Sequence, residues 1–397
     1  MTSPTDGTAH ADGADEAHDD IIYPATLPFV LVHLAAFGAL WSGVTTGALV
    51  SCLALYVVRM FGVTAGYHRF FSHRSFKTSR VGQLALAWVA QSSAQRGAIW
   101  WAAKHRHHHR HSDTEHDVHS PRHSGFLHSH VGWIFTPRHE ETDFEAVPDL
   151  TRYPELMLLE RYPHLPAAVL AIGCLLLGGW PGLVVGFFWS TVLLYHGTFF
   201  INSLAHVVGR QRYVTGDDSR NNWWLALITL GEGWHNNHHF YMSSTRQGFR
   251  WYEIDPTYYA LKAMSWVGLV WELREPPAAV LAGEQPLGRR TVEKVAAELA
   301  ASFPVRAIAE QVQAAWAGVH PVDDLRERAR KLVADAEHAL SEVEMPSLPG
   351  FDDLRRRALE MFAYTPSLDD IVQRARLMLA RAVSLHLLEG MENGSPA

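Results

Sequence analysis

Cysteine is almost missing from this chain of 397 residues. Only Cys52 and Cys174 occur, and both lie inside apolar runs. Two isolated thiols cannot build the disulfide framework of a small secreted domain, and they cannot supply the four ligands of a cysteine-bound iron–sulfur centre. The sequence therefore excludes both kinds of structure within this chain.

A dense stripe of Lys and Arg is also lacking. The chain has 34 basic and 41 acidic residues, with a formal net charge of −7 when its 25 histidines are counted as neutral. This balance argues against nucleic acid as a partner. Residues 1–25 are rich in Asp, Ala, Gly and His, with no basic segment ahead of an apolar core. We therefore expect a disordered acidic N-terminus and no secretory signal.

Long apolar runs are present, and they are confined to the first 275 residues. Their lengths predict four membrane-spanning helices at about 27–41, 44–66, 165–179 and 181–207. A buried helix of a soluble protein is the alternative for the two shorter runs.

Charge placement favours the membrane interpretation. The links within the two hairpins, 41–46 and 178–182, contain no charged residue. The opposite side receives Arg59, Arg69, Arg74, Lys77, Arg80, Arg96, Lys104 and Arg106. Basic residues mark the cytosolic side of a membrane protein, so the pattern predicts a multi-pass protein with both termini and every histidine motif in the cytosol.

Histidines occur in two triplets with the spacing i, i+3 and i+4, which places three imidazoles on one face of a helical turn. The triplets are His105, His108 and His109, and His235, His238 and His239. A single ion rarely takes six protein imidazoles, so the two triplets predict two half-sites around more than one metal ion. A histidine-rich surface run that binds metal adventitiously is the alternative.

Further residues extend or limit this pattern. His68 and His73 are five residues apart, a separation that turns by about 140° on an ideal α-helix, so they reach one site only where a helix ends or bends. Asn202 and His206 stand at i and i+4 near the end of the last apolar run. His107 is rotated about 200° from His105, and we expect it to point away from the metal.

These residues belong to motifs that appear in one order: GxTAGYHRxxSHRS, HRxHH followed by SDT, GFxxSHxGW, NSxAH and EGWHNxHH. Over residues 28–275 the chain resembles the integral-membrane fatty acyl desaturases of the acyl-CoA (stearoyl-type, delta-9) family. The resemblance implies an all-α fold with four transmembrane helices under a cytosolic helical cap. It also implies a histidine-box di-iron site with the ligands His68, His73, His105, His108, His109, His206, His235, His238 and His239, and a water held on one iron by Asn202.

The activity that the resemblance implies is oxygen-dependent desaturation, an oxidoreductase reaction that introduces a cis double bond at carbon 9 of a saturated long-chain acyl group. The implied cofactors are two iron ions (Fe2+/Fe3+) and O2, without haem or an iron–sulfur cluster in this chain. Arg138 and Trp101 are candidates for substrate binding. A membrane di-iron fatty acyl or alkane hydroxylase and a non-catalytic metal-binding membrane protein are the alternatives.

The acyl carrier and the electron donor stay open. Animal members of the family read Trp-Ala-Arg-Asp before the second histidine motif, where the Arg and Asp help to hold coenzyme A, whereas this chain reads Trp-Ala-Ala-Lys at 101–104. The substrate is then a CoA thioester, a carrier-protein thioester or a lipid-bound chain. The sequence also lacks the His-Pro-Gly-Gly signature of a fused b-type cytochrome. We therefore expect a separate ferredoxin or b-type cytochrome with its reductase.

Residues 276–397 differ from the membrane desaturase domain at 26–275, because they are charged and amphipathic. Acidic pairs follow Pro321, Pro349 and Pro366, as expected where helices begin. We expect a soluble helical extension that begins after Pro276-Pro277, supplies no metal ligand and can be removed without loss of the metal site. It is either a module for a partner or membrane surface, or a small bundle docked on the cap.

Overall fold

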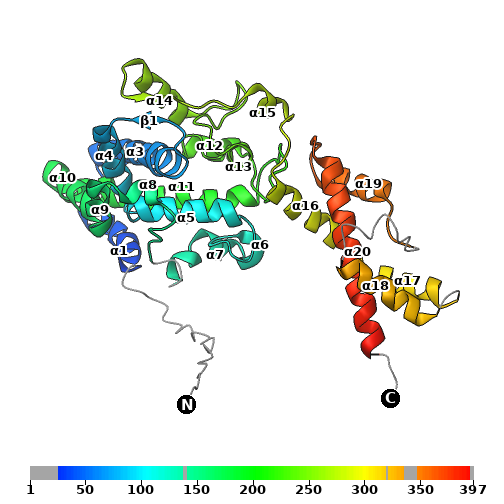
Figure 1. Ribbon diagram of the computed structural model, residues 1–397. Helices are drawn as coiled ribbons and strands as arrows, with labels where there is room; N and C mark the ends of the chain where they lie inside the picture. Colours follow the sequence, from blue (N-terminus) through cyan, green and yellow to red (C-terminus); the bar gives the residue numbers. More distant parts are fainter. Residues whose placement is uncertain (1–25, 137–140, 319–320, 335–346, 394–397) are drawn as a thin grey trace, which may run out of the picture.

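The computed structural model describes residues 26–136, 141–318, 321–334 and 347–393. Segment 1–25, predicted to be disordered, and Arg138, predicted to bind substrate, lie outside the described residues. Within the described ranges the architecture is helical, with one two-stranded sheet (Figure 1). The predicted all-α class with clustered histidines is confirmed at this level.

The first apolar segment folds into a broken hairpin. Its elements are α1 (Leu27–Ala36), α2 (Ala39–Ser42), α3 (Thr46–Phe61) and the π-helix η1 (Gly62–Ser72), which continues α3. The chain reverses at Gly43, whose φ of 74° is readily adopted only by glycine. Thr45 then caps α3, because its side chain accepts a hydrogen bond from the Ala48 amide at 3.2 Å.

The second apolar segment forms a longer helical stretch. It consists of α10 (Leu165–Pro181), the π-helix η4 (Gly182–Trp189), α11 (Ser190–Asn202) and the short η5 (Leu204–His206). Gly179 interrupts α10 with a φ of 62°, so the uncharged link predicted at 178–182 coincides with a kink. Helix α3 packs against η4 and α11, which brings the two apolar segments together.

Two helical stretches, Thr46–Ser72 and Leu165–His206, have the length and composition needed to cross a membrane, and Leu27–Ser42 is a shorter apolar helix. Their outer surfaces are apolar and open. Trp41 near the first reversal is 83% exposed, and Leu177 near the second is 93% exposed. An apolar surface of this kind marks a site of association with lipid or with another apolar surface.

Arg59 lies inside this apolar layer, although the sequence pattern counted it with the basic residues of the cytosolic side. The residue is 1% exposed. Its guanidinium donates to the Thr191 hydroxyl at 2.7 Å, to the Ser92 carbonyl at 3.3 Å and to the Ser190 hydroxyl. Neutral oxygens of neighbouring helices thus satisfy the donors of this arginine, which links α3 to the second apolar segment.

A cap of short helices covers one end of the apolar layer. It comprises α4 (Arg80–Gln91), α5 (Ala98–His111), α6 (Pro121–Ser124), α7 (Phe126–His130), η2 (Gly132–Phe135), α8 (Pro148–Thr151), α9 (Pro154–Arg161), α12 (Trp223–Ile228), α13 (His235–Phe240), α14 (Pro256–Trp266) and α15 (Ala278–Ala282). Strand β1 (Lys77–Thr78) pairs antiparallel with β2 (Val270–Trp271), so that Lys77 faces Trp271. Tyr67, Phe71, Ile99 and Leu150 belong to the buried core that η1 shares with the cap helices.

The C-terminal residues form a separate helical bundle. Its helices are α16 (Arg289–Ala301), α17 (Val305–Ala317), α18 (Val322–Ala334), α19 (Phe351–Met361) and α20 (Leu368–Asn393). Helix α20 packs against the other four (Figure 1). Two aspartates stand in the first turn of α18, α19 and α20, as the sequence predicted. The buried core of the bundle includes Val214 from a cap loop, so the bundle is docked on the cap.

Candidate metal centre

The π-helix η1 brings His68 and His73 to one side of the chain. In a π-helix the backbone hydrogen bond joins the carbonyl of residue i to the amide of residue i+5. The amide of His73 donates to the carbonyl of His68 at 3.2 Å, and the two rings lie 4.9 Å apart. The sequence required a helix end or a bend at this point. The structure meets that requirement with a change of helix type that ends at Ser72.

Helix α5 carries His105, His108 and His109, and its first turn is fixed by a partly buried carboxylate. Glu160 accepts hydrogen bonds from the amides of Ile99 and Trp100 at 3.2 and 3.3 Å. These amides have no partner within the helix, so the carboxylate accepts their hydrogen bonds. Its negative charge also interacts favourably with the positive end of the helix dipole. Burial raises the pKa of Glu160 despite these bonds.

Helix α13 carries His235, His238 and His239 and is buried along its ligand-bearing length. The intervening asparagines hold it in place. Asn236 accepts from the amides of Arg212 and Tyr213, both at 2.8 Å, and Asn237 donates to Glu253 at 2.9 Å. The three imidazoles are thereby left free to face the other histidine-bearing elements.

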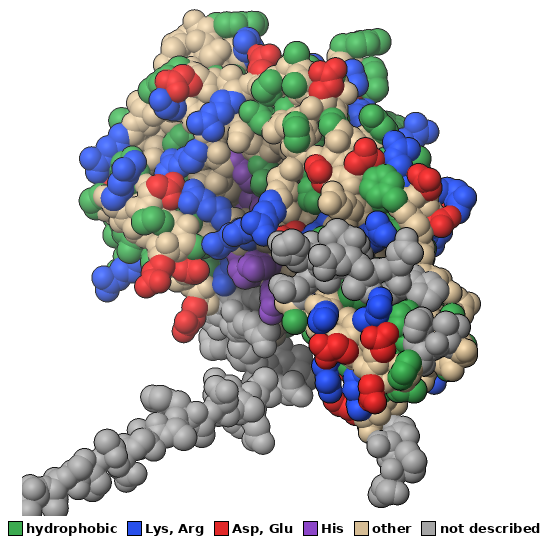
Figure 2. Space-filling model, turned by 45° about the vertical axis from the view of Figure 1, so that its right-hand side comes forward, with side chains coloured by type: hydrophobic (Ala, Val, Ile, Leu, Met, Phe, Trp, Pro, Cys, Tyr) green, Lys and Arg blue, Asp and Glu red, His purple; other side chains and the backbone are tan. Residues whose placement is uncertain are grey.

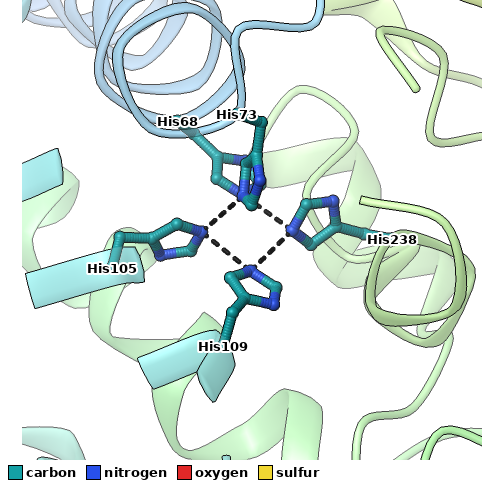
Figure 3. A group of neighbouring side chains, drawn as sticks. All are labelled: His68, His73, His105, His109 and His238. Atoms are coloured by element: carbon teal, nitrogen blue, oxygen red, sulfur yellow. Dashed lines mark hydrogen bonds between the residues drawn. The ribbon is translucent and has the colours of Figure 1, made fainter. Parts of the chain in front are cut away.

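Five of the predicted ligands form a first group: His68, His73, His105, His109 and His238. Figure 3 shows them converging from η1, α5 and α13 on one central space. The Nε2 atoms of neighbouring histidines in this group are separated by 3.0 Å (His68–His238), 2.8 Å (His73–His105), 3.0 Å (His105–His109) and 3.0 Å (His109–His238). One atom from each residue lies within 4.8 Å of every other.

The other four predicted ligands form a second group, and all are buried: His108, His206, His235 and His239. The Nε2 atoms of His206 and His235 lie 3.1 Å apart. The groups adjoin, since the rings of His109 and His239 are 4.4 Å apart. His107 belongs to neither group, and its Nε2 lies 2.9 Å from the carbonyl oxygen of His116.

Four carboxylates stand behind these histidines, and the sequence analysis missed them. Each faces a ring Nδ1: Asp113 faces His206 at 2.8 Å, Asp117 faces His108 at 2.9 Å, Asp217 faces His239 at 2.7 Å, and Glu232 contacts His68. A carboxylate that accepts the Nδ1 proton leaves the lone pair on Nε2 and orients the ring for metal binding.

The sequence carried a signal for three of these four carboxylates. Asp113 and Asp117 stand a few residues after the triplet on α5, and Glu232 opens the motif that contains the second triplet. Asp217 lies 22 residues before the histidine that it contacts, so no local spacing could reveal it.

The protonation of the centre suits a cation. Burial alone would raise the pKa values of Asp113, Asp117, Asp217 and Glu232, but the facing imidazoles outweigh it and hold all four below their ordinary values. Burial, followed by the neighbouring imidazoles, lowers the pKa values of His73, His105, His109, His235 and His238. The carboxylates are therefore ionised and these rings neutral at pH 7.

The geometry fits metal ions as well. Two imidazole nitrogens that bind one transition-metal ion at right angles, each at about 2.1 Å, lie about 3 Å apart. The Nε2 separations in the first group match this value. In the second group, His239 directs Nδ1 to Asp217, and its buried Nε2 has no hydrogen-bond partner among the described residues. A buried lone pair of this kind calls for a cation.

Two cavities that share lining residues reach the histidines. The larger has about 1100 Å3 of space between its walls, including the part open to solvent, and it is lined by Phe29, Trp133 and Tyr195 among others. The smaller contacts both groups, through His68 and His235. Both cavities are bordered by Trp101, His105, Thr198 and Asn202. The indole of Trp101 stacks on the ring of His105 at 4.9 Å, so this predicted substrate residue lies where the larger cavity meets the first group.

Comparisons with known proteins agree with this arrangement. Residues 44–266, more than half of the chain, match the family model described as fatty acid desaturase. The chain is 39% identical over 221 residues to the sn-2 palmitoyl-lipid 9-desaturase of Nostoc sp. (strain 36). The aligned residues cover 54% of this chain and 77% of that protein.

Two further relatives differ in the substrate that their names give. The acyl-CoA 5-desaturase of Anemone leveillei is 38% identical over 255 residues, 62% of this chain and 76% of that protein. The sn-1 stearoyl-lipid 9-desaturase of Anabaena variabilis is 37% identical over 248 residues, 62% of this chain and 90% of that protein. The family match runs from the start of α3 to the end of α14, so it contains every histidine of the two groups and ends before the C-terminal bundle begins.

Proposed function

The chain belongs to the fatty acid desaturase family and is a fatty acyl desaturase, and we propose that it introduces a cis double bond at carbon 9 of a saturated long-chain acyl group in an oxygen-dependent reaction. The observation that carries the proposal is the convergence of nine histidines on two adjoining groups beside an apolar cavity. Position 9 rests on the names of two of the relatives, since the third is named for position 5.

We propose that the two groups hold two iron ions. Imidazole ligands suit iron and other transition metals, whereas magnesium and calcium prefer oxygen. Iron held there would supply the oxidising power, by activating dioxygen, that no side chain can provide for removing hydrogens from an unactivated methylene. Overall, two adjacent CH2 groups, O2, two electrons and two protons give one CH=CH unit and two waters. By resemblance, Asn202, which borders both cavities, would hold a water on one ion.

The protein's own contribution is to bind and align the acyl chain. Phe29, Trp100, Trp133 and Phe199 supply apolar wall to the larger cavity. A saturated chain offers no polar handle near the carbons that react, so the fit of the chain in this cavity decides which carbons lie beside the first group. Trp101, which touches His105, fixes the wall at that point. Closely packed walls also exclude water from the oxidising centre.

We also propose the membrane arrangement expected from the sequence: four spans, a cytosolic cap with both termini, and residues 276–397 as a soluble helical extension. The two long apolar stretches, the shorter Leu27–Ser42 and the exposed apolar side chains at the reversals support association with a bilayer. The acyl chain reaches the enzyme as a lipid ester or as a thioester of CoA or carrier protein.

Electrons come from a separate ferredoxin or b-type cytochrome in this proposal. Figure 2 presents imidazoles at the bottom of a hollow beside Lys and Arg side chains. Helix α5 adds Lys104, Arg106 and Arg110 around its own ligands. Basic side chains near the metal centre would guide an acidic carrier, because opposite charges speed encounter and favour one orientation.

Expression in a host that lacks unsaturated fatty acids tests the proposal. Mass spectrometry of the host lipids and thioesters should find a new double bond at carbon 9, and His235→Ala protein, which lacks one ligand, should give none. After a pulse of labelled acyl groups, the class of lipid or thioester in which the double bond appears first identifies the acyl carrier. Hydroxylated chains without alkenes would refute desaturation. Protein that binds zinc, takes up no iron and consumes no oxygen would point to a non-catalytic metal protein.

A further inference from the structure

The carboxylates of the second group stand on two loops that are bonded to each other. Asp113 and Asp117 lie on the loop 112–120, and Asp217 lies on the loop 213–219. The amide of Asp218 donates to Asp113 Oδ2 at 2.8 Å, the same oxygen that faces His206. A displacement of either loop would therefore move carboxylates that orient the ligands of the second group.

Helix α16 of the C-terminal bundle contacts both loops. The ammonium group of Lys294 donates to the carbonyl of Ser112, the residue before Asp113. Arg122, just beyond the first loop, donates to Asp218 at 2.7 Å and to Glu298 of α16 at 2.5 Å. One arginine thus ties the bundle to the second loop.

The second loop is also packed closely against the bundle. Val214 contributes to the buried core that the bundle helices build. Gly216 has a φ of 76°, and a Cβ atom there would stand 3.3 Å from Thr291 and 3.4 Å from Val295 of α16. This close contact restrains the loop backbone at Gly216, the residue directly before Asp217.

The carboxylate of the first group is held in a different way. Glu232 is paired with Arg69 at 3.1 Å, and Arg69 is paired with Asp255 at 2.9 Å, deep in the cap. The bundle thus lies against the supports of one group, while the support of the other comes from the desaturase domain itself.

We propose that Lys294, Arg122 and Glu298 are positioning residues of the second metal site, and that the C-terminal bundle holds the two loops whose carboxylates orient His108, His206 and His239 toward that metal. This inference rests on the proposed two-metal centre. It changes the expectation that the extension is separable, because the bundle contributes to the affinity of one site without supplying a ligand.

Cobalt(II) binding to metal-free, full-length protein in detergent tests this inference. Lys294→Met keeps the length of the side chain but removes the donor, whereas Lys294→Arg keeps a donor. Lys331→Met is the matched control, because Lys331 lies on α18 and is 67% exposed in a surface ion pair. The absorption bands of the two sites are assigned with His238→Ala, which lacks a ligand of the first group, and His239→Ala, which lacks one of the second.

Groups that orient metal ligands typically change affinity by about 10-fold to 100-fold, and Lys294 acts one step further from the metal. We expect Lys294→Met to weaken the second site about tenfold and the first site less than twofold, while Lys294→Arg and Lys331→Met bind as the unchanged protein does. Hydrogen exchange of 112–120 and 213–219 should rise in Lys294→Met alone. Equal weakening of both sites, or no weakening, would overturn the coupling. An unchanged protein that binds fewer than two ions would overturn the two-metal centre itself, and the inference with it.

Discussion

Replacing Asp217 by Asn isolates the effect of a carboxylate that touches a ligand but not the metal. Asp217 Oδ1 accepts from the Thr215 hydroxyl at 2.7 Å and from the Ser219 amide at 3.1 Å. These donors will keep the amide oxygen of Asn on the same side, so its NH2 group must face Nδ1 of His239. Two groups that both donate cannot pair, and the proton of His239 will move to Nε2. The nitrogen that should bind the metal is then blocked.

The size of the effect follows from this change of tautomer. Loss of a group that orients a metal ligand costs about 10-fold to 100-fold in affinity, or about 1.4–2.8 kcal/mol. Because the substitution also favours the wrong tautomer, we expect a value near the upper end for the second site. The first site should change little, since Glu232 and the ligands around it are untouched.

Iron per chain, measured by mass spectrometry of the metal after dialysis against a series of free iron concentrations, checks this prediction. Asp217→Asn protein should saturate at one ion where the unchanged protein holds two, and desaturation should fall in parallel. Glu155→Gln is the control, because Glu155 is a carboxylate paired with Arg80 on the outside of the cap. If Asp217→Asn protein holds two ions with unchanged affinity, the assignment of tautomers at this centre is wrong.

Three further predictions test the ligand set, the cavity and the donor. Alanine at His108 should remove iron and activity, whereas His107→Ala should retain both, because His107 belongs to neither group; equal iron loss in the two variants would show that the register of α5 is wrong. Trp101→Ala should keep both ions but yield double bonds at several positions, because it removes the wall beside His105; gas chromatography with mass spectrometry of the products would reveal an unchanged single position and so contradict the role of Trp101. Turnover with an acidic one-electron carrier should weaken as salt rises, and purified protein that desaturates with NAD(P)H and oxygen alone would refute the need for a separate donor.

That each histidine triplet lies on one face of a helix could be anticipated, because this depends on local periodicity, whereas the division of both triplets between the two groups could not. A triplet at i, i+3 and i+4 must share a face wherever a helix forms, and both α5 and α13 formed at the triplets. The apolar segments could also be predicted, because their length and their uncharged links follow from consecutive residues of the sequence. Even the need for an irregularity between His68 and His73 followed from counting residues.

The remaining features depend on contacts between distant segments. No spacing rule predicts that Asp217 meets His239, that Glu160 holds the first turn of α5, or that Arg59 is satisfied by neutral oxygens. The dependence of η1 on i→i+5 bonds also escaped prediction, since only an irregularity of some kind could be inferred. The docking of α16 was hidden for the same reason: its amphipathic pattern indicates a buried face but not the surface that covers it.

The four carboxylates behind the ligands have a consequence in terms of charge balance. Arg69 touches Glu232 but is also matched by Asp255, so the Arg69–Asp255 pair is neutral, and the four carboxylates place four negative charges behind the ligands. Two divalent cations held by these residues would bring four positive charges and offset the carboxylates, whereas two trivalent cations would leave an excess of two. A low-dielectric interior disfavours such an excess. A di-iron centre held there would therefore be most stable in its divalent state, and replacing Asp113 or Asp117 by Asn would favour that state further, which potentiometric titration would register as a rise in the reduction potential relative to the unchanged protein.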